Sequence, residues 1–442
     1  MNMPRRIALI SEHASPLADT GSVDAGGQNI YVAQVARCLA AQGCEVTVFT
    51  RRDSAALPAR VRMCRGVRVV HVDAGPPRFV AKEMLLPHMP AFTRGVMDEL
   101  ARMGGCDVVH ANFFMSGMVA QRIKEKMGIP YVMTFHALGL VRRAHQGATD
   151  AFPDSRIEIE RMLVKEADLL IAECPQDERD LLQLYGADAR KIRMVPCGFD
   201  AHEFSPMDRQ RARALLGLDE KDFIVLQLGR MVQRKGIDNV IRALAHLPDS
   251  SSRASSRLMV VGGESADGAA LCSQEFLRLQ EVALECGVSD RVIFTGHRHR
   301  YELRAHYAAA DVFVTTPWYE PFGITPLEAM ACGIPVVASA VGGLAYTVVE
   351  GVTGYLVPPQ DPQALAQCLQ RLREHPGLAQ AMGRCGLNRV RAQFTWEQVS
   401  RSLLGAYAEA MPGAPGLDAE VERFFPLGTA ATAAPDRFAA FS

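Results

Sequence analysis

The sequence lacks several patterns that mark common protein classes. Its 48 basic and 49 acidic side chains give a net charge of −1, and neither half is strongly basic, so the positive field that attracts a nucleic acid backbone is missing. The eleven cysteines are an odd number and form no C-x-x-C pair. This argues against a disulfide framework or a structural zinc site, and it is typical of reduced thiols in a cytoplasm. We therefore expect a cytoplasmic protein without nucleic acid partners.

Long hydrophobic runs are also missing. Near the N-terminus only residues 7–10 are continuously apolar, which is short of the about 7–15 residues of a signal-peptide core. Residues 329–349 carry no charge, but glycines and Pro335 divide them into short bursts. We expect a helix end, a buried strand and a glycine turn there, and no transmembrane segment.

Short aliphatic runs alternate with helical patterns along the chain, beginning with a helix expected over residues 27–42. Strands are predicted in two series, at 6–11, 45–50, 67–72, 108–110, 131–135 and 169–172, and then at 223–229, 257–261, 291–295, 312–315 and 336–339. Such alternation predicts parallel sheets with helices on both faces.

A segment rich in turn-forming residues, 195–206, separates the two series. The prediction is an α/β protein with two doubly wound, Rossmann-like domains that face each other across a cleft. Residues 1–200 form the first domain and residues 201–410 the second, and residues 411–442 form a tail rich in Ala, Pro and Gly.

In open parallel sheets, ligands bind beyond the carboxyl ends of the strands. The first loop in such a position contains Gly26 and Gly27, which let a backbone approach a phosphate at the start of a helix. The alternative is a simple glycine turn in which Asp24 caps the helix. The loop is not G-x-G-x-x-G, which disfavours a nicotinamide cofactor.

The second loop follows the strand at 223–229. It places Arg230 and Lys235 between a strand end and a helix start, where two cations can neutralise a diphosphate. A solvated, charged turn is the alternative.

The third loop, residues 320–333, is the most informative. Gly323 and the amides of Ile324 and Thr325 form an anion cradle between two carboxylates, those of Glu320 and Glu328. Carboxylates bind phosphates poorly but accept hydrogen bonds from sugar and ribose hydroxyls. A diphosphate site framed by hydroxyl acceptors indicates a nucleotide-sugar site.

The competing interpretation of the third loop is structural. Pro326 suits a first helical position, and a helix is expected from there to about Cys332. Thr325 and Glu328 would then form a capping box that satisfies backbone donors.

The pattern E-P-F-G-x-T-x-x-E-A-M-A-x-G of residues 320–333 resembles the signature of retaining, metal-independent glycosyltransferases of family four, which have the GT-B fold. The loops at 24–28 and 229–236 and the V-P-C-G-F-D segment at 195–200 match the family as well. The resemblance extends to about residue 410. Within the family, the N-terminal half is most similar to sucrose-phosphate synthases, sucrose synthases and the glycosyltransferase that begins mycothiol synthesis.

The resemblance implies roles for individual residues. Catalytic roles fall on His136, Glu320, Arg230 and Lys235, and donor binding on Gly26, Gly27, Arg230, Lys235, Gly323, Ile324, Thr325 and Glu328. Acceptor binding falls on Asp24, Lys82, Asn112, Thr134 and Arg156. Without the resemblance, His136 reads as a packed histidine at a strand end, and Lys82 and Arg156 read as surface charges.

The activity that the resemblance implies is transfer of a hexosyl unit, glucosyl from UDP-glucose, to an acceptor hydroxyl, with a sugar phosphate as the acceptor. It implies no cofactor and no metal, and a front-face reaction in which the leaving phosphate takes the acceptor's proton. His297 and His299 are accordingly expected in a solvated turn. The alternatives are a mannosyltransferase that uses GDP-mannose, a sugar-nucleotide epimerase, and an inactive sugar-nucleotide-binding subunit.

Overall fold

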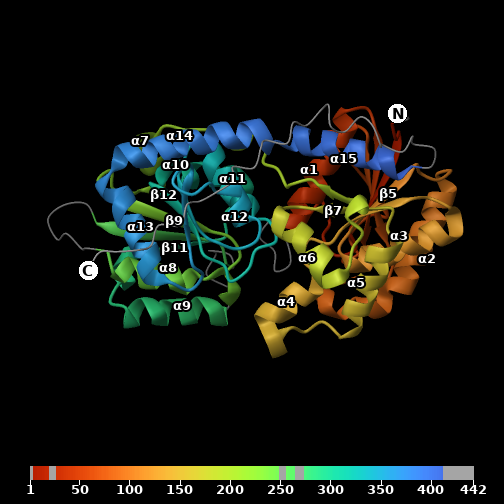
Figure 1. Ribbon diagram of the computed structural model, residues 1–442, viewed down its shortest axis with the longest axis horizontal. Helices are drawn as coiled ribbons and strands as arrows, with labels where there is room; N and C mark the ends of the chain where they lie inside the picture. Colours follow the sequence, from red (N-terminus) through yellow and green to blue (C-terminus); the bar gives the residue numbers. More distant parts are fainter. Residues whose placement is uncertain (1–2, 19–25, 248–254, 264–272, 412–442) are drawn as a thin grey trace, which may run out of the picture.

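The computed structural model describes residues 3–18, 26–247, 255–263 and 273–411. Two α/β lobes lie side by side in it, the first built mainly from the N-terminal half and the second from the C-terminal half (Figure 1). Asp24 and all of the expected tail beyond Met411 lie outside the described residues.

The first lobe contains a sheet of eight strands in the order β3-β4-β2-β1-β5-β6-β7-β8, parallel except for the edge strand β3. Its strands are β1 (Arg6–Ile10), β2 (Glu45–Arg51), β3 (Arg60–Cys64), β4 (Val67–Val72), β5 (Val108–Asn112), β6 (Tyr131–Thr134), β7 (Leu169–Ala172) and β8 (Ile192–Met194). Its helices are α1 (Gly27–Ala41), α2 (Met89–Arg102), α3 (Phe114–Met127), α4 (Gly139–Gln146), α5 (Ser155–Glu166) and α6 (Pro175–Tyr185), with a short 3-10 helix, η1 (Lys82–Met84).

The second lobe contains a parallel sheet of six strands in the order β11-β10-β9-β12-β13-β14. Its strands are β9 (Phe223–Leu228), β10 (Ser256–Val261), β11 (Val292–Gly296), β12 (Val312–Thr315), β13 (Val336–Ser339) and β14 (Gly354–Val357). Its helices are α7 (Arg209–Leu216), α8 (Ile237–Ala245), α9 (Gln274–Glu285), α10 (Arg300–Ala309), α11 (Ile324–Ala331), α12 (Leu344–Thr347), α13 (Pro362–Glu374) and α14 (Pro376–Gln393), with the 3-10 helix η5 (Gln233–Lys235).

The alternation of side chains along the buried strands divides the core into two layers in the first lobe. On β1, Ile7 and Leu9 join a hydrophobic cluster with α1, whereas Ala8 and Ile10 join a second cluster with α2 and α3. A strand that is apolar on both faces needs helices on both sides, which is the doubly wound arrangement that the sequence predicts.

Each sheet has a point where the strand order reverses. The chain goes from β1 to β2 on one side and later places β5 on the other side of β1, and β9 lies in the same way between β10 and β12. In doubly wound sheets the crevice at this point, beyond the carboxyl ends of the strands, is where ligands bind. The loops after β1, β5, β9 and β12 are therefore the ones to examine for a site.

The chain crosses between the lobes twice, and the two crossings are joined. The Phe199 N–H donates to the Phe394 carbonyl at 2.9 Å, and Phe199 and Thr395 form a bridge. Gly198 lies against Trp396, since a Cβ at Gly198 would be 2.9 Å from Trp396 Cδ2. These contacts form one connection between the lobes.

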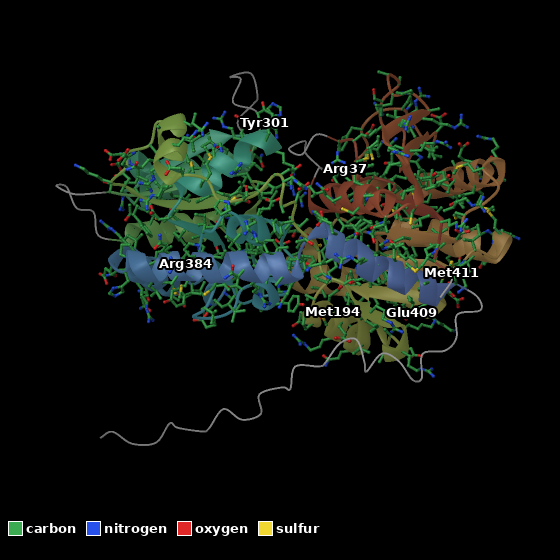
Figure 2. All side chains as sticks on the ribbon, turned by 90° about the horizontal axis from the view of Figure 1, so that it is seen from above. Arg37, Met194, Tyr301, Arg384, Glu409 and Met411 are labelled. Carbon is green, nitrogen blue, oxygen red and sulfur yellow. The ribbon has the colours of Figure 1, made fainter. Side chains whose placement is uncertain are left out.

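The helix after the second crossing, α15 (Trp396–Ala410), belongs to the first lobe. It lies along α1 (Figures 1 and 2), and Tyr407 Oη is 2.6 Å from His110 Nδ1 of β5. At its far end Glu409 pairs with Arg193, next to Met194 (Figure 2). The sequence interpretation, which gave residues 396–410 to the second domain, is corrected here, because this helix buries its apolar side on the first lobe.

The predicted strands agree with the structure to within two residues at each end, but three strands were not predicted. The edge strand β3 alternates charged and apolar residues and runs antiparallel, and β8 has only three residues. The third, β14, begins at Gly354 within a turn-rich stretch. Across the part of the chain that the structure describes, no helix is long and apolar enough to cross a membrane.

Candidate functional site

The loop before α1 meets the second lobe across the cleft. A Cβ at Gly26 would lie 3.8 Å from Arg230 Nε, and a Cβ at Gly27 would lie 3.7 Å from Ile324 Cδ1. Three of the sequence-predicted loops therefore converge at one place. The backbone at Gly26 thus faces the Arg230 guanidinium directly across the cleft.

The start of α1 is fixed to the first sheet. The Gly26 N–H donates to Asn29 Oδ1 at 2.9 Å. Gln28 Nε2 donates to Ser11 Oγ at 3.1 Å and to the Asn112 carbonyl at 3.2 Å. The first turn of the helix is thus tied to the ends of β1 and β5, which aims its free amides at the cleft.

The loop after β9 brings Lys235 onto Glu320. Their side chains form an ion pair and are 19% and 13% exposed. Burial disfavours charge on the Glu320 carboxylate, but Lys235, Arg234 and Arg230 outweigh it and hold the pKa of Glu320 below its ordinary value. Burial lowers the pKa of Lys235, against the effect of Glu320.

Gly236 explains how η5 fits against β12. Its φ is +63°, and a Cβ there would lie 2.1 Å from the Thr316 carbonyl oxygen. The same two residues are joined by a hydrogen bond, in which Thr316 Oγ1 donates to the Gly236 carbonyl at 2.9 Å. Only glycine allows this approach, which sets Lys235 at the switch point.

The Glu320 loop is held by close backbone packing. The Gly343 N–H donates to the Glu320 carbonyl at 3.1 Å. Gly342 has a φ of +46°, and a Cβ there would lie 2.0 Å from the same oxygen. The position of the Glu320 carboxylate therefore depends on a glycine more than twenty residues further along the chain.

Glu328 is not a capping residue. The helix α11 begins at Ile324, earlier than the predicted Pro326, and its N-cap is Gly323 with no side-chain cap. The capping-box alternative is therefore wrong. Glu328 is 1% exposed, and Tyr307 Oη donates to its Oε2 at 2.9 Å. Burial raises the pKa of Glu328.

The cation beside Glu328 is Arg300, whose Nη1 lies 2.9 Å from Glu328 Oε1 and whose Nε pairs with Glu203. Arg300 follows His297 and His299, the two residues that were expected in a solvated turn, but its own side chain is only 17% exposed. Among the described residues no three His, Cys, Asp or Glu side chains are grouped as ligands of a metal ion.

His136 lies at the carboxyl end of β6, with a φ of +56°. Its Nδ1 is 3.0 Å from Glu173 Oε1 and its Nε2 is 3.0 Å from Asn112 Oδ1. The ring of Tyr31 packs edge-on against it, with the centroids 4.8 Å apart. Glu173 is not among the residues predicted from the sequence, although its position directly after a predicted strand was a signal.

Two of the predicted acceptor residues are deep in the first lobe. Thr134 is fully buried and its Oγ1 is 2.8 Å from His110 Nε2. Arg156 is 1% exposed, its Nε donates to Glu160 Oε1 at 2.7 Å, and its guanidinium lies 4.5 to 5.0 Å from three phenylalanine rings, those of Phe113, Phe114 and Phe152. The structure therefore brings neither side chain to the open surface of the cleft.

Lys82 lies on η1, where it pairs with Glu83 at 3.7 Å, and Arg142 of α4 approaches the same carboxylate at 3.7 Å. Beside η1, at the ends of β1 and β2, a pocket is lined by Glu12, His13, Thr50, Arg51, Asp53, Phe79, Val80 and Leu85. Lys82 and Arg142 thus share one carboxylate in the lobe that contains this largely polar pocket.

Contacts between the lobes close the cleft along one edge. Tyr319 of the second lobe stacks on His145 with the ring centroids 5.0 Å apart, and the Arg234 guanidinium lies 5.2 Å from the centroid of the Tyr319 ring. Gln146 donates to Tyr319 Oη, and Cys174 Sγ is 3.4 Å from the Pro321 carbonyl. None of these residues was singled out from the sequence.

Two family models match the chain in succession. The model described as Glycosyltransferase Family 4 matches residues 25–203, and the one described as Glycosyl transferases group 1 matches residues 208–389. The chain is 40% identical to the D-inositol 3-phosphate glycosyltransferase of Streptomyces bingchenggensis (strain BCW-1), over 93% of this chain and 90% of that protein. It is 39% identical to the D-inositol 3-phosphate glycosyltransferase of Actinosynnema mirum, over 92% of this chain and 97% of that protein.

Among solved structures, sucrose-phosphate synthase from Thermosynechococcus elongatus superposes with a TM-score of 0.84. It is 36% identical in sequence, and the match covers 91% of this chain and 98% of that one. Both lobes and their orientation are therefore shared along nearly the full length of the two chains.

Proposed function

The chain belongs to the family 4, group 1 glycosyltransferases with the GT-B fold, and we propose that it transfers a glucosyl unit from UDP-glucose to a hydroxyl of a phosphorylated polyol. The configuration at the anomeric carbon is retained. The observation that carries the donor part of this proposal is the convergence of Gly26, Arg230, Lys235 and Glu320 at the two switch points.

The donor occupies the crevice between the lobes. Its diphosphate meets Arg230 and Lys235 and the amides at the start of α11, and the hydroxyls of the transferred sugar meet Glu320. The ribose meets Glu328, which is buried beside Tyr307 and Arg300. Carboxylates as hydroxyl acceptors and cations as phosphate partners suit these roles.

Bond breaking leaves negative charge on the diphosphate and positive charge on the sugar ring. Preorganised cations in a water-poor cleft stabilise the leaving group, a contribution worth about 10²–10³ in rate for a single donor. The leaving phosphate takes the proton of the acceptor hydroxyl on the same face. The reaction is proposed to need no metal ion, and unchanged turnover in excess EDTA is the expected result.

The acceptor part of the proposal rests on two kinds of support. The similar proteins of Streptomyces and Thermosynechococcus are named for inositol phosphate and sucrose phosphate reactions. On this chain, Lys82 and Arg142 share the Glu83 carboxylate. Lys82 follows Val80 by two residues, and Val80 lines a pocket together with Glu12, Thr50, Arg51 and Asp53. Cationic side chains can bind the phosphate of a phosphorylated polyol, and nearby side-chain oxygens can accept hydrogen bonds from its hydroxyls.

A thermal-shift panel of UDP, ADP, GDP, UDP-glucose and GDP-mannose, with and without inositol phosphate or fructose 6-phosphate, tests the proposal. A ligand at 100 times its Kd adds about 2.7 kcal/mol of stability. Stabilisation by UDP and UDP-glucose that a phosphorylated polyol increases, followed by product formation, is the expected result. A response to GDP-mannose alone would move the proposal to mannosyl transfer, and no response to any nucleotide would contradict it.

A further inference from the structure

A buried carboxylate lies directly behind His136. Glu173 follows β7, is 3% exposed in its side chain, and accepts from His136 Nδ1 at 3.0 Å. Its Oε1 also accepts from the Cys197 thiol at 3.0 Å. Nothing in the donor or acceptor roles described above uses this residue, yet it contacts the histidine at the carboxyl end of β6.

The other side of the ring faces an oxygen as well. Asn112 Nδ2 donates to the carbonyls of Ile10 and His110, both at 3.3 Å, which fixes the orientation of the amide. Its Oδ1 is therefore the atom that lies 3.0 Å from His136 Nε2. An amide oxygen and a carboxylate oxygen only accept, so both ring nitrogens must donate.

The ring has little freedom to turn away from these partners. His136 occupies the left-handed region, with a φ of +56°, which a residue other than glycine adopts at a cost. The ring of Tyr31 covers one edge at a centroid distance of 4.8 Å. A strained backbone conformation persists only where the surrounding structure holds it in place. The constraint at His136 therefore also holds the direction in which Nε2 points.

The charges around the pair favour an ionised carboxylate at Glu173. Burial opposes ionisation of Glu173, but His136 and hydrogen bonds outweigh it and hold the pKa of Glu173 below its ordinary value. The titratable groups that face the pair from the packed elements are Tyr31 of α1, His110 of β5, Asp177 of α6, Cys197 after β8 and Glu320 of the second lobe. Burial raises the pKa of Asp177 to about 8, so that of these two neighbouring carboxylates Glu173 is the more readily ionised.

We infer that Glu173 is a positioning residue that keeps His136 doubly protonated, so that His136 acts in the cleft as a hydrogen-bond donor through Nε2 and not as a base. A ligand oxygen, from a phosphate or a hydroxyl, replaces Asn112 Oδ1 as the partner of Nε2. The identity of that ligand rests on the proposed function, whereas the state of the ring does not.

The state of the ring can be read directly by NMR of the ring nitrogens in protein labelled with ¹⁵N-histidine. The chain has 12 histidines, and the signals lost in His136→Asn identify those of His136. At pH 7.5 the expected spectrum has both His136 nitrogens protonated in the wild type. In Glu173→Gln the ring is expected to be neutral with one proton, and Glu173→Asp is expected to restore part of the doubly protonated form.

The matched control is Cys197→Ala, which removes a second hydrogen bond to the same carboxylate and leaves its charge. It should leave the His136 signals unchanged. A neutral His136 in the wild type at pH 7.5, or a ring unaffected by Glu173→Gln, would overturn the inference. If Glu173→Gln does not fold, the wild-type spectrum alone still decides, and this measurement requires no substrate, so failure of the proposed donor or acceptor is a separate result.

A kinetic measurement then tests the role in transfer. Once a donor and acceptor pair is found, Glu173→Gln is expected to lower kcat by about 10²-fold with little change in the KM of the donor. The donor role would be overturned if the activity of the wild type rose with pH as His136 lost a proton, and if this rise were absent in His136→Asn. A purely structural role would instead lower the melting temperature and leave the His136 signals as in the wild type.

Discussion

The ammonium of Lys235 is paired with the carboxylate of Glu320, although the two residues are 85 positions apart in the sequence. In the proposed reaction one of them meets the diphosphate and the other meets the transferred sugar. Their pairing makes the two halves of the donor site one electrostatic unit, in which each charge compensates the burial of the other.

Replacing Lys235 by alanine is expected to lower kcat by about 10²–10³-fold, because a preorganised cation beside the leaving diphosphate is lost. Burial still raises the pKa of Glu320 in this variant, but the positive charge of Lys235 no longer lowers it. The carboxylate therefore also becomes easier to protonate. Steady-state kinetics over a range of pH measures the loss of kcat and the easier protonation of Glu320, and thermal melting checks that the variant is folded.

The control for this variant is Lys221→Ala, which removes an exposed lysine that precedes β9 in the same lobe. It should leave kcat and the melting temperature as in the wild type. Turnover of Lys235→Ala within a few-fold of that control would remove the role proposed for Lys235.

Gly342→Ala is expected to disable the site from outside it. A Cβ at residue 342 would lie 2.0 Å from the Glu320 carbonyl oxygen, and the backbone φ of +46° is unfavourable for alanine. The Glu320 loop must shift, and a displacement of about 1 Å at a positioning group can cost about 10²-fold in rate.

Gly377→Ala serves as the control for Gly342→Ala. Residue 377 is exposed in the first turn of α14, and a Cβ there meets no atom within 4 Å. Alanine in a helix should stabilise the protein by up to about 1 kcal/mol and leave activity unchanged. Equal activity of the two variants would show that the Glu320 loop does not depend on Gly342.

Sequence patterns predicted the elements of this fold better than their assembly. Most strands of both sheets, though not β3, β8 or β14, were recognisable because buried parallel strands are short and apolar, and the switch-point loops follow from their order. The docking of α15 on the first lobe could not be predicted from the sequence. It depends on contacts such as that of His110 with Tyr407, which are almost three hundred residues apart in the chain.

The candidate site was predictable to a similar degree. Glu320 and Glu328 were found by their spacing, but the partners of these carboxylates were not. Arg300 sits among histidines in a segment that reads as a polar turn, and Lys235 shows no sign in the sequence of reaching Glu320. Side-chain partners across elements depend on packing that no local pattern encodes.

Glu328→Gln is expected to weaken nucleoside diphosphate binding while leaving inorganic pyrophosphate binding unchanged. A hydrogen bond to a charged acceptor contributes about 1.5–3 kcal/mol, which corresponds to roughly 10–100-fold in affinity. Glutamine keeps an oxygen for Tyr307 but removes the charge that pairs with Arg300. Calorimetric titration with UDP and with pyrophosphate measures the difference.

Glu203→Gln is the matched control, because Glu203 is the other carboxylate that pairs with Arg300 and lies at the surface side of that guanidinium. It should change neither affinity by more than about 2-fold. Equal losses of UDP and pyrophosphate affinity in Glu328→Gln would place Glu328 away from the ribose.

The docking of α15 is expected to be sensitive to acid through His110. Burial, followed by the effect of His136, lowers the pKa of His110 to about 3, against about 6.5 in an unfolded chain. Between these values the unfolded state binds a proton that the folded state does not, so the stability that His110 contributes is present above about pH 6.5 and is lost as the pH falls toward 3. The slope is at most about 1.4 kcal/mol per pH unit.

Urea unfolding at a series of pH values between 4.5 and 7.5 measures this slope. In His110→Gln the slope of the free energy of unfolding against pH should decrease by an amount that corresponds to at most one bound proton. This holds for any loss of absolute stability, because the carboxylates that titrate in the same range are unchanged. His246→Gln removes an exposed histidine at the end of α8 and should keep the wild-type slope. A His110→Gln slope equal to that of His246→Gln would mean that the contact of Tyr407 with His110 of β5 is not an acid-sensitive point of the fold.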